Sequence, residues 1–235
     1  MNIKIKIHFT RYILIFMFMF FIINGVVENI IIKSKINSFT RSCKLVSEDT
    51  ENGIKYFCVS RETYESSLKQ IDGKMYIGSS GDILLKQASP YPEIPVFHQL
   101  MTFFIGGHAG YVIDSKTTVE INGKDYNNKV SYYNNDWFNL KECIGVRLKD
   151  RSLVSDVTES IKSKVGSKYN YTFILDDGYY CTDLMSKSVT DVNKYKNIND
   201  FLFTTANDII TSSNTEICYY HYIDSNGIKN VYYIN

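Results

Sequence analysis

The chain has 235 residues, of which 44% are hydrophobic, and this is enough for one globular body with a hydrophobic core. Its 26 basic and 25 acidic residues leave a formal charge of +1, which excludes the strongly basic surface that nucleic-acid-binding proteins use. We therefore expect no nucleic-acid partner.

Residues 1–35 differ from the rest of the chain. Lys4, Lys6 and Arg11 precede an apolar run over residues 12–27. This pattern is typical of a secretory signal, whose apolar region spans about 7–15 residues, or of a membrane anchor of about 17–25 residues. Since no small-x-small cleavage site is obvious, we favour a retained anchor over a secreted, cleaved form. The basic flank then places the body outside the membrane. A buried core helix is the alternative.

Residues 36–74 are expected to form an N-terminal extension with a β-hairpin. Cys43 and Cys58 flank two short β-type runs joined by the turn-rich "EDTENG". These two cysteines could form a cross-strand disulfide or stay as free thiols, and the sequence leaves both alternatives open. Cys143 and Cys218 are expected to be buried. The five cysteines contain no Cys-x-x-Cys pair or His/Cys cluster, so neither a metal nor an organic cofactor is expected.

Residues 75–235 are expected to form the main domain. β-type runs follow one another first, which predicts an antiparallel sheet, and all three prolines fall in one exposed loop, "SPYPEIP", with His98 just after it. The predicted strands lie in "MYIGSSGDILL", "FFIGGHAGYVID", "TTVEING" and "ECIGVRLK".

Helical patterns dominate after these strands. Apolar residues at helical spacing predict helices over residues 152–166 and 181–192, and a shorter helix is expected within 204–213. The Tyr-rich tail predicts a hairpin about residues 225–227. The fold class is therefore α+β, with an antiparallel sheet or partial barrel packed against helices.

Cys181 begins the second predicted helix, where the helix dipole lowers the pKa of a thiol. A nearby histidine would complete its activation, and the chain has four. His8 lies in the targeting segment, His98 in the proline loop, and His221 in the tail, where a structural role is expected. His108 is the best candidate, because "IGGHAGYVID" places it on a strand beside glycines that allow close backbone approach.

A third polar group is needed to orient the imidazole of His108. Glu120 lies on the following strand, either opposite His108, with Cβ atoms about 5 Å apart, or diagonal to it at about 7–8 Å. Asn122 shares the same strand face and is the fallback. A slip of one residue in the register would turn both side chains away.

This order of motifs resembles the NlpC-type papain-like cysteine hydrolases in their circularly permuted, YiiX/YebB-like form. The resemblance covers about residues 76–191 and rests on "GDILL", "GGHAGYVID" with an acidic residue on the next strand, and "YYCTDLMSKS". The run "VGSKYNYTF" is similar to the Gly-x-x-Tyr-x-x-x-Phe pattern that this group often carries before the cysteine.

The resemblance implies a permuted papain-like fold with Cys181 as nucleophile, His108 as general base and Glu120 as the residue that fixes the imidazole. It implies the backbone N–H of Cys181 as one oxyanion donor. Tyr169, Tyr180 and Asp82 are further candidates for the substrate pocket or the oxyanion site, although a structural role is favoured for Asp82.

The expected function is hydrolysis of a peptide, cell-wall or acyl-amide bond through a thioester on Cys181. Thiol lipase or acyltransferase activity on lipids is the alternative within the same chemistry. A third alternative is a non-catalytic surface module of the same fold that holds a peptide or lipid. The expected partners are thus an amide or ester substrate and, through the N-terminal segment, a membrane.

Overall fold

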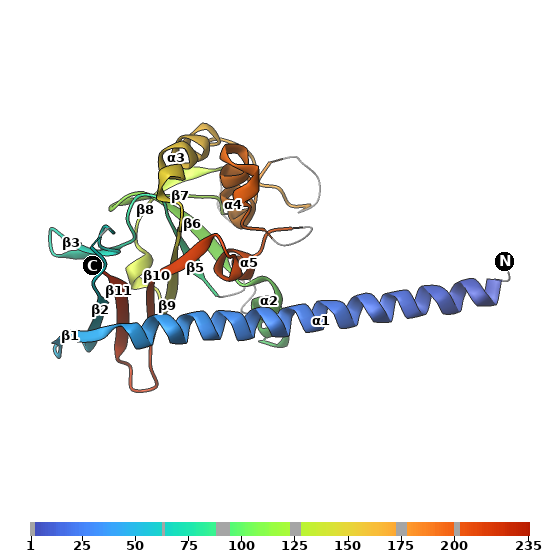
Figure 1. The fold of residues 1–235 in the computed structure, drawn as a ribbon, viewed down its shortest axis with the longest axis horizontal. Coiled ribbons are helices and arrows are strands. Elements are labelled where there is room, and N and C mark those ends of the chain that lie inside the picture. The colour runs from blue at the N-terminus through green and yellow to red at the C-terminus, as the bar shows by residue number, and fades with distance from the viewer. Residues whose placement is uncertain (1–2, 63, 88–94, 123–127, 173–177, 200–202) are drawn as a thin grey trace.

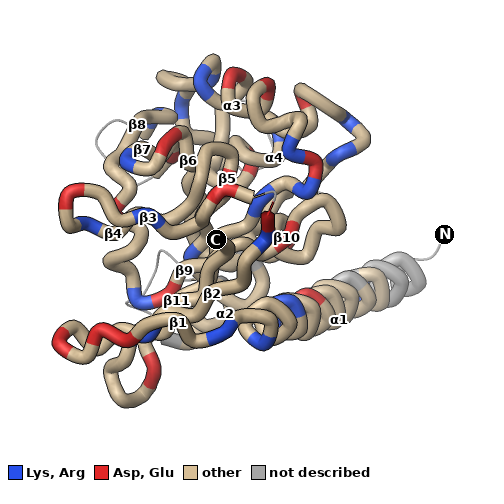
Figure 2. The backbone as a smooth tube through the Cα atoms, turned by 60° about the vertical axis from the view of Figure 1, so that its left-hand side comes forward, with Lys and Arg blue, Asp and Glu red and all other residues tan. Residues whose placement is uncertain are grey.

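A nine-stranded mixed sheet forms the centre of the molecule, with helices packed against it (Figure 1). This computed structural model describes residues 3–62, 64–87, 95–122, 128–172, 178–199 and 203–235. The architecture confirms the α+β class and the apolar N-terminal helix. Basic and acidic residues are interspersed over the globular body (Figure 2), as the near-zero formal charge leads one to expect.

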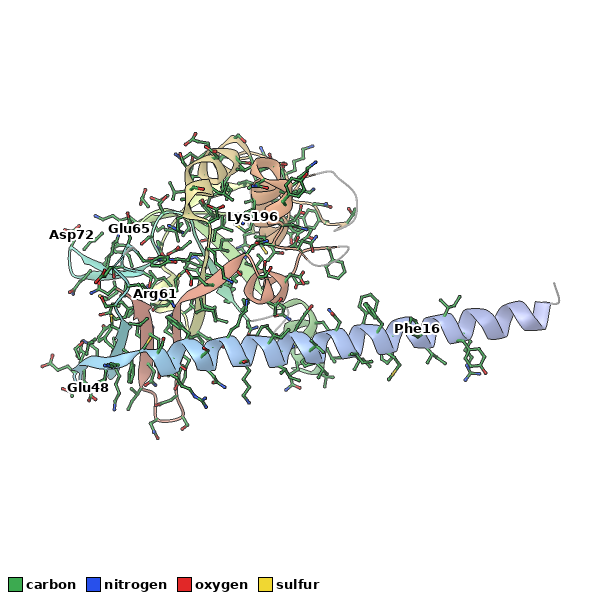
Figure 3. The ribbon with its side chains drawn as sticks, in the orientation of Figure 1. Phe16, Glu48, Arg61, Glu65, Asp72 and Lys196 are labelled. Atoms are coloured by element: carbon green, nitrogen blue, oxygen red, sulfur yellow. The ribbon has the colours of Figure 1, made fainter. Side chains whose placement is uncertain are left out.

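Helix α1 (Ile3–Ser42) is one continuous helix of 40 residues. Its N-terminal half extends well beyond the globular body (Figure 1). The segment Arg11–Ser42 reaches a mean hydropathy of 2.2 and is long enough to cross a membrane. Tyr12 and Phe16 are 70% and 73% exposed, and Phe16 projects from the part of α1 outside the body (Figure 3).

The C-terminal half of α1 packs on the body and does not end at residue 35. Asn29 donates a hydrogen bond of 2.9 Å to a backbone carbonyl of a second helix, that of Phe103. Lys35 Nζ donates to three carbonyls at the end of α5 (Ala206–Thr211), at 2.8 to 3.0 Å. A cation at a helix C-terminus satisfies carbonyls that lack helical partners. Ile32 and Phe39 are buried in the core.

The hairpin expected within residues 36–74 is formed by β1 (Lys44–Asp49) and β2 (Ile54–Val59). Strand β2 also pairs in parallel with β11 (Lys229–Ile234), where Phe57 stacks on Tyr232 with ring centroids 4.6 Å apart. The sheet is therefore mixed, not purely antiparallel, and it continues across the expected division at residues 74 and 75. All five cysteines are free thiols, so Cys43 and Cys58 are not bonded.

The other strands include the tail hairpin of β10 (Thr215–Ile223) and β11, as expected. The sheet order is β1-β2-β11-β10-β9-β5-β6-β7-β8, and all pairs except β2 with β11 are antiparallel. A separate two-stranded sheet holds β3 and β4. The remaining strands are β3 (Leu68–Ile71), β4 (Lys74–Ile77), β5 (Asp82–Lys86), β6 (His108–Asp114), β7 (Thr117–Glu120), β8 (Ser131–Asn134) and β9 (Glu142–Leu148).

Helix α2 (Pro95–Ile105) was not expected, because "FFI" favours a strand and His98 was placed in a loop. The helix lies against α1 at Gly25, where an added Cβ would come within 2.7 Å of the Phe104 ring. This tertiary contact outweighs the local β preference. Most of the proline loop, residues 88–94, lies outside the described residues.

Helices α3 (Val154–Ser163) and α4 (Cys181–Val192) form as predicted and pack against each other. Short 3-10 turns complete the described elements: η1 (Trp137–Asn139), η2 (Arg151–Leu153) and η3 (Lys194–Lys196). The apolar faces of α3 and α4 are buried in the core, as are the expected cysteines. These residues are Val157, Ile161, Leu184, Met185, Val189, Cys143 and Cys218.

His221 is a buried structural histidine, as expected. Its Nε2 lies 2.8 Å from the carbonyl of Leu140, and its Nδ1 lies 2.9 Å from the hydroxyl of Tyr219. Burial lowers the pKa of His221 to about 4, although the carbonyl of Leu140 opposes the shift. The ring is therefore neutral at neutral pH and joins β10 to the segment that precedes β9.

Asp82 at the start of β5 forms a buried ion pair with Arg147 of β9. Both side chains are at most 1% exposed, and the carboxylate accepts from Arg147 Nη2 at 2.8 Å and from Nε at 3.1 Å. It also accepts from the backbone N–H of Ser79 at 2.8 Å. Removing one partner of such a pair leaves an uncompensated buried charge.

We predict that Asp82→Ala lowers the free energy of unfolding by about 3 to 5 kcal/mol, because Arg147 would lose its buried counter-ion. Chemical denaturation followed by fluorescence would measure the loss. Glu159→Ala removes an acid that pairs with Lys162 on the surface at 2.9 Å and should leave the midpoint unchanged. Equal midpoints for the two variants would contradict the structural role of Asp82.

Candidate active site

The structure brings His108 and Cys181 together, although they lie far apart in the sequence. His108 is the first residue of β6 and Cys181 is the first residue of α4, and these two elements are in contact. The two groups lie close enough for each to shift the pKa of the other. The sulfur also lies 4.0 Å from the carbonyl oxygen of Gly107. The two expected reacting groups therefore meet where the sheet joins the helix.

Glu120 on β7 is the residue that holds the ring of His108. The register pairs Glu120 with Gly110, so Glu120 takes the diagonal position relative to His108. Its Oε2 lies 2.7 Å from Nε2 of the imidazole. This contact leaves Nδ1 as the ring nitrogen that can serve the thiol. Asn122, the fallback, lies farther along the chain and lines a cleft beside the ring.

Two further side chains orient Glu120. Its Oε1 accepts hydrogen bonds from Thr118 Oγ1 at 2.6 Å and from Trp137 Nε1 at 2.8 Å. The Trp137 ring also stacks on the imidazole of His108, with centroids 5.8 Å apart and planes 9° from parallel. Sequence reasoning missed both residues. Strand alternation could have found Thr118, which precedes Glu120 by two positions. Trp137 lies on η1, and no local spacing connects it to the site.

Gly110 provides the space in which the Glu120 side chain lies. An added Cβ at this position would come within 2.9 Å of the Trp137 ring and 3.1 Å of Glu120 Cγ and Cδ. Contacts this short would force the carboxylate or the indole to move. The glycine is therefore required for the diagonal contact between Glu120 and His108.

The three ionisable groups shift one another's pKa values. Burial alone lowers the pKa of His108, but hydrogen bonds and charges from Cys181 and Glu120 outweigh it and raise the pKa to about 9. Burial raises the pKa of Cys181, but the bond to His108 and its charge bring it below the ordinary value. The pKa of Glu120 is likewise lowered, because His108 outweighs the effect of burial. The three shifts all favour the charged form of the group concerned.

The start of α4 stabilises the thiolate and fixes its position. The backbone N–H groups of Ala109 and Thr182 lower the pKa of Cys181 further. Both neighbours of Cys181 are bonded to Thr204. The N–H of Thr204 donates to the Tyr180 hydroxyl at 2.8 Å, and its carbonyl accepts from Thr182 Oγ1 at 2.7 Å.

The remaining candidates take other places. Asp82 is not at the site: it lies four residues along β5 from Lys86, the pairing partner of His108, or about 13 Å at about 3.3 Å per residue. Its carboxylate neutralises buried Arg147 instead. The side chain of Tyr180 is buried and bonded to Thr204, which makes it an anchor for α4. Tyr169 is half-buried beside Tyr179, and its role in a pocket stays a prediction.

Comparison of the chain with protein-family models, curated proteins and solved structures gives no significant match. The site is therefore described from its own geometry, in which the ring of His108 lies between the thiol of Cys181 and the carboxylate of Glu120. The exposed fractions of the His108 and Glu120 side chains are 18% and 12%, so solvent and a ligand can reach them.

We predict that iodoacetamide alkylates Cys181 faster than an ordinary thiol at neutral pH, with a pH–rate profile displaced to lower pH, because His108 lowers the pKa of the thiol. In His108→Gln the rate at pH 6 should fall roughly tenfold or more, and it should rise with pH toward the ordinary thiol pKa of about 8.5. Stopped-time alkylation with peptide mapping would give both profiles.

The other half-buried thiols provide an internal reference for this measurement. Burial raises the pKa of Cys43 to about 11 and also raises that of Cys58, so both should react slowly at neutral pH. A Cys181 profile that matches theirs would contradict the ion pair.

Proposed function

We propose that the chain is a cysteine hydrolase that cleaves an amide bond, with Cys181 as nucleophile, His108 as general base and acid, and Glu120 as the orienting group. The single observation that carries the proposal is that Cys181, at the start of α4, lies beside His108, whose ring is held by the Glu120 carboxylate. Nucleophile, base and orienter in this sequence are the features of activated thiol catalysis.

We also propose that the fold is a permuted papain-like one of the NlpC type. Two features support this. The histidine strand β6 precedes the cysteine helix α4 in the chain, and the N-terminal end of α4 lies against β6.

The proposed reaction begins when the thiolate attacks the carbonyl carbon, and an S–C bond forms as the carbonyl electrons move to oxygen. His108 then donates its proton to the leaving nitrogen while the C–N bond breaks, which gives an amine and a thioester. Water attacks the thioester and gives a proton to His108. The C–S bond breaks, and the acid is released from a restored thiolate and imidazolium.

The first turn of α4 supplies the donor for the developing oxyanion. The helix starts at Cys181, so the backbone N–H of this residue lies outside the pattern of helical hydrogen bonds. The positive end of the helix dipole has the same orientation. A preformed donor of this kind stabilises the tetrahedral intermediate more than the ground state.

The alternative of a thiol lipase or acyltransferase has one specific observation in its favour. Helix α1 joins the catalytic body to an exposed apolar segment, and α2 beside it exposes Val96 and Leu100. Both features would keep the site near lipid. A non-catalytic module of the same fold remains the third proposal, and it predicts an unreactive Cys181.

For localisation, we propose a retained membrane anchor with the catalytic body outside. Two observations support retention over cleavage within residues 1–35. The helix is unbroken from Ile3 to Ser42, and Asn29, Ile32 and Lys35 contact the body. A cut in this region would remove side chains that hold α2 and α5 in place.

We predict that the purified full-length chain hydrolyses N-acyl amides or peptides faster than phospholipids in a panel of both, and that Cys181→Ala lowers the rate by roughly 10³-fold or more. Mass spectrometry of the quenched reaction should show the acyl group on Cys181. Cys58→Ala is the matched control and should keep the rate. A profile restricted to lipids would replace the amidase with the lipase, and activity retained by Cys181→Ala would exclude both.

We predict that the full-length chain stays in the membrane fraction after alkaline carbonate extraction, because exposed apolar side chains cover the outer half of α1. Phe16→Asp together with Phe20→Asp should release it, since a charge at the centre of a spanning helix costs about 2.5–3.5 kcal/mol. The side chains of Phe16 and Phe20 are 73% and 47% exposed, so the fold should survive. Release of the unmodified chain by carbonate would contradict the anchor.

A further inference from the structure

A cleft of about 230 Å³ opens beside His108, on the side where Glu120 contacts the ring. It is lined by residues of β5, β6, β7, β8 and the η1 turn, and of the segments that flank them. His108 lines the cleft, and Cys181, which does not line it, lies close enough to the same ring to shift its pKa. Its lining includes Lys86, His108, Glu120, Asn122, Asp136 and Trp137.

Lys86 is the cation of this cleft and lies next to the imidazole. It is the last residue of β5 and pairs directly with His108 of β6. Directly opposed residues on antiparallel strands have Cβ atoms about 5 Å apart and share one sheet face. The side chain is half-buried, and within the described ranges no carboxylate forms an ion pair with it.

The two carboxylates of the cleft leave the charge of Lys86 largely uncompensated. Glu120 is bonded to the protonated ring of His108, and its other oxygen accepts from Thr118 and Trp137. Asp136 is exposed at the start of η1, where water screens its charge. An anion that enters the cleft would therefore meet one partly desolvated cation beside the catalytic ring.

The reaction itself indicates which part of a substrate reaches this cleft. His108 delivers a proton to the leaving nitrogen, so the leaving group has to lie against the imidazole. Atoms beyond that nitrogen then extend along the ring towards Lys86. A carboxylate or phosphate within a few bonds of the leaving nitrogen would come within reach of the Lys86 ammonium.

We infer that the leaving group of the substrate carries an anionic group, a carboxylate or a phosphate, that pairs with Lys86 in the cleft beside His108 and Glu120. The inference rests on the proposed hydrolase function and names the substrate class for that site. Lys86 is thus a specificity residue, and the proton transfers at His108 do not require it.

Two small alkylating reagents test the charge preference without any assumed substrate. Iodoacetate is anionic and iodoacetamide is neutral, and both alkylate Cys181. Because both reagents react with the same thiolate, the ratio of their rates does not depend on the fraction of Cys181 that is ionised. In Lys86→Gln of the full-length chain this ratio should fall roughly three- to tenfold, the size expected for a charge about 6 Å away in a partly hydrated site. Lys86→Arg should retain the ratio.

Lys44→Gln is the matched control, because it removes the same charge from an exposed position on β1, at the far edge of the sheet. Its ratio should equal that of the unmodified chain. An unchanged ratio in Lys86→Gln, with Cys181 still fast toward iodoacetamide, would overturn the anionic leaving group and leave the hydrolase standing. A Cys181 that is slow toward both reagents in the unmodified chain would overturn both proposals.

Substrate pairs then separate the two sources of the anion. N-dodecanoylglycine has a carboxylate two bonds from the scissile nitrogen, N-dodecanoylglycinamide is its neutral match, and an N-acyl phosphatidylethanolamine carries a phosphate. For whichever anionic substrate the unmodified chain hydrolyses, Lys86→Gln should raise KM roughly three- to tenfold. The KM for the neutral N-dodecanoylglycinamide should stay unchanged. Equal effects on the charged and neutral members would count against the inference.

Discussion

The imidazole of His108 lies between a thiol and a carboxylate, and the rest of the site depends on this contact. Neither partner is stable alone in a partly buried position: a lone thiolate or a lone carboxylate would lose hydration without compensation. Beside the ring, the pKa values of the thiol and the carboxylate fall and that of the imidazole rises, so each shift favours the ionised form of its group. Trp137 and Thr118 hold the Glu120 carboxylate in place by donating hydrogen bonds to it.

The sequence predicts those parts of the structure that depend on residues close together in the chain. The α4 helix occupies the predicted residues, because its apolar stripe and the thiol at its start are both local patterns. The relation of His108 to Glu120 follows from strand alternation once the two strands are adjacent, although the diagonal choice depended on the turn between them. The position of the candidate triad was therefore predictable to within one register step.

Contacts between distant segments were not predictable in the same way. The parallel pairing of β2 with β11 joins opposite ends of the chain, and nothing in either strand specifies its partner. Asp82 resembles a site residue in its motif, but its role is set by Arg147, a residue on another strand. Trp137 reaches Glu120 from a turn with no repeating pattern, and α2 becomes helical through its contact with α1 at Gly25.

The junction of α1 with the body has a mechanical consequence. Helix α1 enters the body with no flexible linker, and Lys35 joins it to the end of α5. If the outer half lies in a bilayer, the tilt of that helix sets the direction in which the cleft beside His108 faces. The cleft would then work at one fixed height above the lipid surface. Molecules held farther out, on a long polymer for example, would be beyond its reach.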